Sequence, residues 1–258
     1  VDWGGVEQNV GLSDNKKTAQ YIANKSVTLV KNKNSLVPLK PSKLKNIAHL
    51  ILTTDDDANS FLKILDRDLK RTHRNVKRIF INEELSENRI SSIVQDLKSS
   101  SIVVVSMLIR IRMDKGESTI DDTHALLLER LKGEGIPTVG ISFGSPYLPS
   151  YDSLDAYMCA YGYGSISVKA AANALWGRST IDGKLPVTLS EKYKRGHGVT
   201  IKKRKFSFDQ KKKEYDLGLA WDVLDQGISS EIFPGAQVMV IKDKKLIAQE
   251  SFGKVSYK

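Results

Sequence analysis

Carboxylates that are candidates for proton-transfer chemistry gather in two parts of the sequence. Asp55 belongs to an acidic triplet, and a longer loop further on contains Glu117 and Asp121. Two carboxyl groups hydrolyse a glycosidic bond only when a defined distance separates them in space. The sequence supplies the residue types but does not pair Glu117 with a second acid. The carboxylates of the triplet at 55–57 are of a kind that binds cations, although helix capping is the favoured interpretation.

Other catalytic patterns are missing from the sequence. It contains no glycine-rich dinucleotide loop and no phosphate-binding P-loop. The four histidines, His49, His73, His124 and His197, have no metal-ligand spacing. His49 lies in an apolar run and is expected in the core, and His197 is expected in a linker. We therefore expect neither a metal nor a cofactor.

Alternating apolar runs and amphipathic segments must position these side chains. Continuous apolar strands that alternate with helices are typical of a mainly parallel sheet covered on both faces. The predicted fold is therefore an α/β three-layer sandwich with about six strands. The run at 26–32 follows a helical segment and is expected to be an edge or antiparallel strand. The predicted strands are the runs at 26–32, 46–54, 77–82, 101–108, 137–144 and 155–161.

Three amphipathic segments are predicted as covering helices. In the segment at 57–70, Phe61, Leu62, Leu65 and Leu69 share one helical face. The segments at 122–132 and 165–176 have similar apolar stripes. Asp57 and Asp122 are the predicted N-caps of the first two helices.

The carboxyl ends of parallel strands are where ligands bind in sheets of this kind. The loops that follow the predicted strands should therefore form one substrate-facing edge, and the loop after the run at 101–108 is the longest of them. Long loops at such an edge often carry function. The candidate substrate-facing residues are Asp55, Asp121, Ser145, Tyr147 and Tyr161.

Composition limits the classes of partner. The net charge is +10, and much of the excess lies in the basic stretch at 194–214. A basic face for nucleic acid usually spreads over a folded surface with interleaved aromatic residues, whereas this stretch is linear, so we expect a solvated linker at 195–216 and no nucleic-acid binding. An anionic partner is the alternative. Cys159 is the single cysteine, which excludes an intramolecular disulfide. No apolar run is long enough to span a membrane.

The last part of the sequence predicts a helix followed by a β-hairpin. Two apolar runs, Gln237 to Ile241 and Leu246 to Ser251, flank the polar turn KDKK. An isolated hairpin is only marginally stable in water. This hairpin is therefore expected either to close the preceding domain or to begin another one.

Three segments together resemble the carboxy-terminal α/β sandwich domain of glycoside hydrolase family 3. The first is SVTLVKNKNSLVPLK at 26–40, which is similar to the first strand of that domain and its LPL turn. The second is GISFGSPYLPSYDSLDAYMCAYGYG at 140–164. The third, AAANALWGRSTIDGKLPVTL, is similar to the helix and GxLPVT ending of the family. The sandwich is expected at 13–194, after a lead-in segment at 1–12.

The resemblance implies a part of a glycosidase that hydrolyses β-O-glycosidic bonds. Family members carry their aspartate nucleophile on a preceding TIM barrel, which would be the partner of this chain. The loop RIRMDKGESTIDD does not reproduce the acidic motif of the β-glucosidase branch, although Glu117 lies near the expected acid/base position. The loop is more similar to the β-N-acetylhexosaminidase branch, which implies an amino-sugar or β-glycan substrate. The alternative is a non-catalytic carbohydrate-facing or scaffolding module.

The segment at 219–258 resembles the start of a serine β-lactamase-like domain of the class C and esterase type. Its pattern is the FPGAQVMV stretch followed by a glycine. In such domains the S-x-x-K motif follows this segment and would come after residue 258, so residues 217–258 are expected to be a truncated domain whose partner is the remainder of that domain. The resemblance implies that the parent protein is periplasmic or in the cell envelope.

Overall fold

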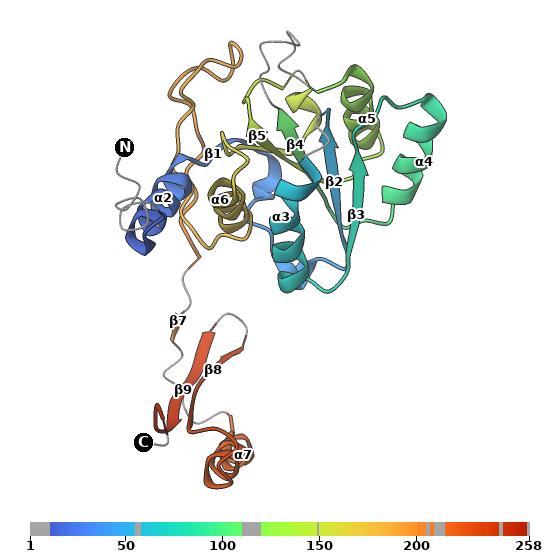
Figure 1. Cartoon of the computed structure of the whole chain (residues 1–258). Helices are drawn as coiled ribbons and strands as arrows, with labels where there is room; N and C mark the ends of the chain where they lie inside the picture. The colour runs from blue at the N-terminus through green and yellow to red at the C-terminus, as the bar shows by residue number, and fades with distance from the viewer. Residues whose placement is uncertain are drawn as a thin grey trace, which may run out of the picture. The chain divides into compact units, whose positions relative to one another are not determined.

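The fold was described from a computed structural model of the chain (Figure 1). The structure describes residues 11–54, 58–109, 120–148, 150–204, 207–208, 215–242 and 245–256. The chain divides after Arg204 into two compact units. Each unit is described by itself.

The first unit is built on a six-stranded sheet. Its strand order is β1-β6-β5-β4-β2-β3, and only β1 runs antiparallel to its neighbour. This confirms the predicted mainly parallel sheet and its antiparallel edge strand. The strands are β1 (Thr28–Asn32), β2 (Ile47–Thr53), β3 (Val76–Ile81), β4 (Val103–Ile109), β5 (Thr138–Gly144) and β6 (Ala156–Cys159).

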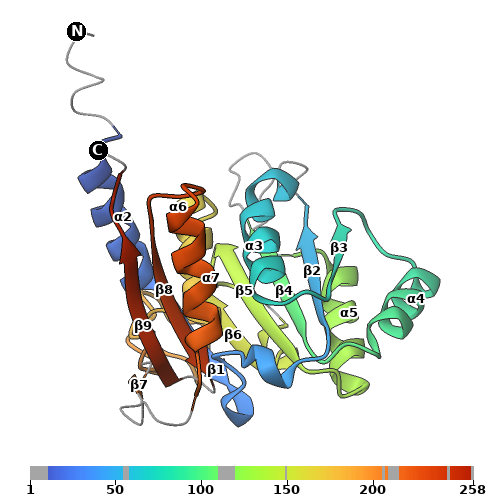
Figure 2. The same ribbon diagram turned by 90° about the horizontal axis from the view of Figure 1, so that it is seen from below.

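Helices cover both faces of this sheet, as Figures 1 and 2 show. On one face lie α2 (Ser13–Ser26), α3 (Ala58–Thr72) and α6 (Ser165–Leu175). On the other face lie α4 (Glu87–Leu97) and α5 (Asp122–Gly133). The three-layer arrangement is therefore confirmed, and α4 is a helix that the sequence interpretation did not name. Short 3₁₀ turns occur at Lys33–Ser35, Pro41–Lys43 and Tyr151–Ser153.

The strands are apolar on both sides because each side of the sheet has its own core. Ile51 and Val104 pack with α3 and α6, whereas Leu50 and Val105 pack with α4 and α5. All four side chains are fully buried. Burial of one such side chain stabilises the fold by about 1.5–3 kcal/mol. This two-sided burial explains the continuous apolar runs in the sequence.

The chain returns across the sheet after α6 and extends the sandwich to Arg204. Leu185 N–H donates to His197 O, and Val199 N–H donates to Leu29 O on β1. Ile181 and Ile201 form an isolated antiparallel bridge. The predicted linker at 195–216 is therefore wrong over 195–204, because backbone hydrogen bonds hold these residues on the sandwich despite their charge.

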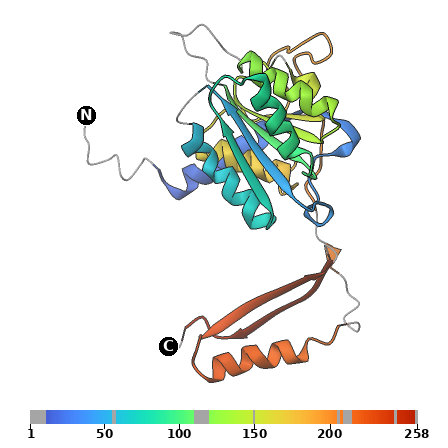
Figure 3. The same cartoon turned by 90° about the vertical axis from the view of Figure 1, so that its right-hand side faces the viewer.

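The second unit consists of one helix and a small sheet. Helix α7 (Gly218–Ser229) lies along the hairpin of β8 (Gly235–Lys242) and β9 (Lys245–Gly253), as Figure 3 shows. The short strand β7 (Ser207–Phe208) pairs with β9. The predicted helix and hairpin are confirmed.

A ring contact joins α7 to its hairpin, since the rings of Trp221 and Phe252 lie 5.4 Å apart. Gly227 leaves room for the ring of Phe233, which lies in the connection between α7 and β8. Other apolar side chains of this unit are exposed: Leu219, Val223, Ile232, Met239 and Ile241. The unit therefore has little core of its own. Within the described parts of both units, no helix is long and apolar enough to cross a bilayer.

Candidate functional site

The candidate site lies along the edge where the parallel strands end. Asp121 precedes α5, Ser145 and Tyr147 follow β5, and Tyr161 follows β6. Strands β4, β5 and β6 are neighbours in the sheet, so their connections share this edge. Asp55 and Glu117 lie outside the described residues.

Asp121 caps helix α5. Its Oδ1 accepts hydrogen bonds from the Thr123 N–H at 2.7 Å and the Thr123 hydroxyl at 2.5 Å. Burial favours the neutral acid, but these hydrogen bonds and the nearby His124 outweigh it, so the pKa of Asp121 is lowered. Asp121 is therefore an ionised cap at neutral pH. The cap predicted at Asp122 is one residue too late, because Asp122 is the first residue of the helix.

The turn after β5 is held from within the sheet. Gly144 has a φ of 108°, which suits glycine. The Tyr157 hydroxyl on β6 donates to Pro146 O at 2.6 Å, and the Ser142 hydroxyl donates to Ser145 O. Ser145 is buried, and its Oγ accepts from the Tyr147 N–H at 3.3 Å. Tyr147 itself is 45% exposed and presents its ring to solvent at this edge.

Tyr161 ties the carboxyl edge to the antiparallel strand β1. Its hydroxyl donates to Thr28 Oγ1 at 2.9 Å. Burial raises the pKa of Tyr161 to about 12, so the phenol stays neutral in the folded protein. The residue has a φ of 59°, a left-handed backbone conformation that is uncommon for a tyrosine. Its hydroxyl therefore serves an internal hydrogen bond.

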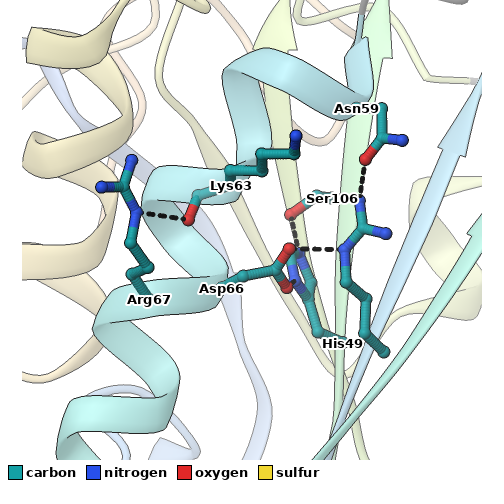
Figure 4. Close-up of polar contacts among 7 residues, drawn as sticks. His49, Asn59, Lys63, Asp66, Arg67 and Ser106 are labelled. Carbon is teal, nitrogen blue, oxygen red and sulfur yellow. Dashed lines mark hydrogen bonds and ion pairs between the residues drawn. The ribbon is translucent and has the colours of Figure 1, made fainter.

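A buried polar constellation lies deeper in the same unit (Figure 4). Ser106 Oγ on β4 lies 2.7 Å from His49 Nε2 on β2, and His49 Nδ1 lies 2.5 Å from Asp66 Oδ1 on α3. Asp66 Oδ2 accepts from Arg78 Nε on β3, and Arg78 also donates to Asn59 Oδ1 at 2.5 Å. The prediction that His49 lies in the core is confirmed.

This constellation has the residue order of a serine hydrolase triad but no access for a substrate. Ser106 and His49 are fully buried, and Asp66 is 6% exposed. Burial by itself would raise the pKa of Asp66. The contacts of the carboxylate with His49 and Arg78 have the opposite and larger effect, so the pKa of Asp66 lies below its ordinary value and the carboxylate is charged. The constellation pairs the buried polar groups of β2, β3, β4 and α3 with one another. The sequence signal for this constellation was the presence of His49 and Ser106 inside two otherwise apolar strands.

One further feature lies away from the carboxyl edge. A cavity of about 650 Å³ lies at the opposite, amino-terminal edge, lined by Lys31, Lys132 and Asp155 among others. Burial lowers the pKa of Lys31, whose Nζ donates to Asp152 O at 3.0 Å. Among the residues that the structure describes, no three His, Cys, Asp or Glu side chains come together as metal ligands.

Comparison with known proteins gives a family match over most of the chain. The model of the glycosyl hydrolase family 3 C-terminal domain matches residues 27–223. No curated protein matches the sequence.

Solved structures share the fold. A β-glucosidase from Listeria innocua in complex with gluconolactone has a TM-score of 0.58 and 19% identity over 72% of this chain. A β-glucosidase from Erythrobacter marinus has a TM-score of 0.56 and 17% identity over 74% of this chain. A β-glucoside phosphorylase bound to 2FGlc has a TM-score of 0.50 and 22% identity over 67% of this chain.

The chain spans only 28%, 35% and 31% of these three structures. At such low identity they show the fold alone. The family match extends over well more than half of the chain and includes every strand of the six-stranded sheet. The chain therefore belongs to the glycosyl hydrolase family 3 C-terminal domain family.

Proposed function

We propose that this chain supplies the sandwich half of a glycosidase active site that cleaves β-O-glycosidic bonds. The family match over residues 27–223 is the observation that carries the proposal. In this proposal a TIM barrel provides the aspartate nucleophile, and the carboxyl edge of the sandwich faces the substrate. Tyr147 is the exposed side chain of that edge on which a sugar ring can stack.

The described part of the edge contributes binding rather than proton transfer. Asp121 is engaged as a helix cap, and its lowered pKa makes it a poor general acid at neutral pH. Glu117, in the loop before α5, is the acid/base candidate that we propose from the family resemblance. One carboxyl group cannot act as both nucleophile and acid/base in a retaining mechanism. We therefore expect the chain alone to be inactive on glycosides.

We propose the β-N-acetylhexosaminidase type as the finer assignment. Its support is the sequence between β4 and α5, which lacks the acidic motif of the β-glucosidase branch. The structures compared above are β-glucosidases and a β-glucoside phosphorylase, which lends this finer assignment no support. The substrates tested must therefore include both a β-N-acetylglucosaminide and a β-glucoside.

The experiment is an assay of the chain alone and of the chain joined to a family 3 barrel domain. The substrates are a chromogenic β-N-acetylglucosaminide, a β-glucoside and an acetyl ester. We expect no turnover by the chain alone and glycoside turnover by the joined protein. Preference for the β-glucoside would contradict the finer assignment. Activity of the chain alone that is lost in Glu117→Gln would contradict the barrel requirement.

A non-catalytic carbohydrate-facing or scaffolding module is the second candidate. One observation favours it: Asp121, Ser145 and Tyr161 all use their polar groups in internal hydrogen bonds. In that case the joined protein binds β-glycans without turning them over. Binding that depends on Tyr147, with no turnover of either glycoside, would support this candidate.

For the second unit we propose the beginning of a β-lactamase-like domain. The exposed apolar residues Leu219, Val223 and Met239 support it, because they would be buried once further segments pack against them. A longer version of the polypeptide should protect these residues from solvent. Hydrogen exchange of α7 and β8, compared between the chain and such a longer version, tests the assignment. Equal exchange in both would contradict it.

A further inference from the structure

We propose that the groove between α3 and α6 binds a saccharide that carries an anionic group. The two helices lie side by side on one face of the sheet (Figures 1 and 2). Between them is a cavity of about 290 Å³, lined by Ile64, Arg67, Asp68, Arg71 and, from α6, Ser165, Lys169, Ala172 and Asn173. This site is distinct from the carboxyl edge and does not depend on the function proposed for that edge.

The cations of the groove point to an anionic ligand. Arg67 and Arg71 are one helical turn apart on α3, and Lys169 faces them from α6. Among the described residues, Arg71 and Lys169 have no hydrogen bond or ion pair, and Arg67 donates only to Lys63 O at 3.3 Å. Guanidinium groups bind carboxylate and phosphate oxygens in a bidentate manner. Three cations that line one groove, none of them paired with a carboxylate in the described part of the chain, therefore favour a negatively charged group between them.

The only carboxylate that lines the groove does not cancel this charge. Asp68 Oδ2 accepts from Arg178 Nη1 at 2.6 Å, so its charge is already paired outside the groove. Arg178 Nη2 also donates a hydrogen bond to the Thr72 hydroxyl at 2.6 Å. The charge of the groove therefore remains positive.

The remaining polar groups favour a ligand with hydroxyls. Asp68 Oδ1 is buried and has no hydrogen-bond partner within the described part of the chain. A buried acceptor without a partner is costly, and a ligand hydroxyl that donates to it removes the cost. The Asn173 amide and the Ser165 hydroxyl also line the groove and both donate and accept hydrogen bonds. A fully deprotonated anion such as sulfate offers no donor for Asp68, whereas a sugar hydroxyl does.

The size and the apolar lining select a saccharide among polyhydroxylated anions. The cavity is at the lower end of small-molecule sites, which measure about 300–1,000 Å³, and suits one sugar unit. Its apolar lining consists of Ile64 and Ala172, with no aromatic ring to stack on a nucleobase. Ser165 lies at the start of α6, whose first turn carries no acidic residue, so the helix dipole adds to the positive potential.

The test is isothermal titration calorimetry on the full chain at low salt. The probes are galacturonate and glucose 6-phosphate, which distinguish a carboxylate from a phosphate as the anionic group. The methyl ester of galacturonate and inorganic phosphate are the controls. We expect at least one of the two acidic saccharides to bind, and its matched control to bind about tenfold more weakly or not at all.

Variants separate the groove from the general positive charge of the chain. The double variant Arg67→Ala/Arg71→Ala should weaken binding about tenfold or more, because it removes two direct charge-assisted contacts. The matched control Lys202→Ala/Lys203→Ala removes two charges from the basic stretch and should leave affinity within about twofold, because screening weakens distant charges. Lys70→Ala, on the outer face of α3, should behave like this control.

Four results would overturn the proposal. The first is no binding of either acidic saccharide. The second is equal binding of the neutral ester, and the third is binding of inorganic phosphate as tight as that of glucose 6-phosphate. The fourth is an equal loss of affinity in the Lys202/Lys203 control. Thermal unfolding of each variant checks that the fold is retained, which is expected because Arg67 and Arg71 are exposed.

Discussion

The imidazole Nε2 of His49 lies 2.7 Å from the hydroxyl of Ser106, although the two residues belong to different strands and both are fully buried. The other ring nitrogen meets Asp66, so the histidine links β4 to α3 through the middle of the sandwich. This network gives the sandwich a polar centre whose integrity can be measured.

Asp66→Ala should destabilise the sandwich by about 3–5 kcal/mol, because it leaves buried His49 without its hydrogen-bond partner and partly buried Arg78 without its counter-charge. Urea unfolding measures the change. The control is Asp96→Ala, which breaks the exposed pair with Lys77 and should cost less than about 1 kcal/mol. Equal losses in the two variants would contradict the importance of the buried network.

Asp66 should also make stability fall in acid. Its folded pKa lies below its ordinary value of 3.8, so the unfolded chain takes up the proton first. The stabilisation is complete well above pH 3.8 and is lost as the pH falls from there through the lower, folded pKa. Asp66→Asn should show a shallower decline than the unmodified chain in urea unfolding between about pH 5 and pH 2. Parallel declines would rule out Asp66 as the source.

Tyr161→Phe should reduce stability at neutral pH by about 1 kcal/mol, through loss of the hydrogen bond to Thr28. The folded pKa of Tyr161 is about 12, against an ordinary value of 10.0. Its contribution is therefore present below pH 10 and is lost as the pH rises from 10 to 12. The difference between variant and unmodified chain should shrink over that range in unfolding experiments. A difference that is constant up to pH 12 would exclude this titration.

Val104→Asp should cost about 4 kcal/mol or more, because it places an unpaired carboxylate in the sheet core. Circular dichroism with urea unfolding will show whether the variant folds at all. Val223→Asp is the matched control, since Val223 is 67% exposed. A folded Val104→Asp chain of normal stability would contradict the described core.

Gly183→Ala should destabilise the sandwich by about 1–3 kcal/mol. A methyl group at Gly183 would lie 2.5 Å from Val27 O and 2.6 Å from Ser26 O, and backbone atoms yield little. Gly133→Ala, where nothing lies within 4 Å, is the control and should be close to neutral. Thermal unfolding compares the two. Similar melting temperatures would show that the returning chain does not pack tightly on β1.

The sheet was predictable because its strands are short, continuously apolar and separated by helical patterns. All six strands overlap the predicted runs, and β1 is the predicted antiparallel edge. Helix α4 was not named beforehand, although Ile90, Ile93 and Leu97 form its buried face. The contact between Ser106 and His49 could not be predicted, because it depends on the register between two strands that are far apart in sequence.

The candidate site was harder to predict than the fold. Ser145, Tyr147 and Tyr161 follow the carboxyl ends of their strands and Asp121 precedes α5, but the sequence does not show which of their polar atoms are used in internal hydrogen bonds. The end of the sandwich was also misplaced. Val199 and Ile201 alternate with polar residues as a strand does, but the surrounding lysines and arginines made the segment look fully solvated.

The path of the returning chain has a consequence for self-association. Free strand edges invite pairing with other molecules and are a common start of aggregation. On the outer side of β1, Leu29 O accepts from Val199 N–H and Val30 O accepts from His197 Nε2. These contacts occupy carbonyl groups that another chain would otherwise pair with. At the opposite border, Lys77 and Arg78 place charges along β3. The sandwich thus discourages intermolecular strand addition at both ends of its sheet, by covering one and charging the other.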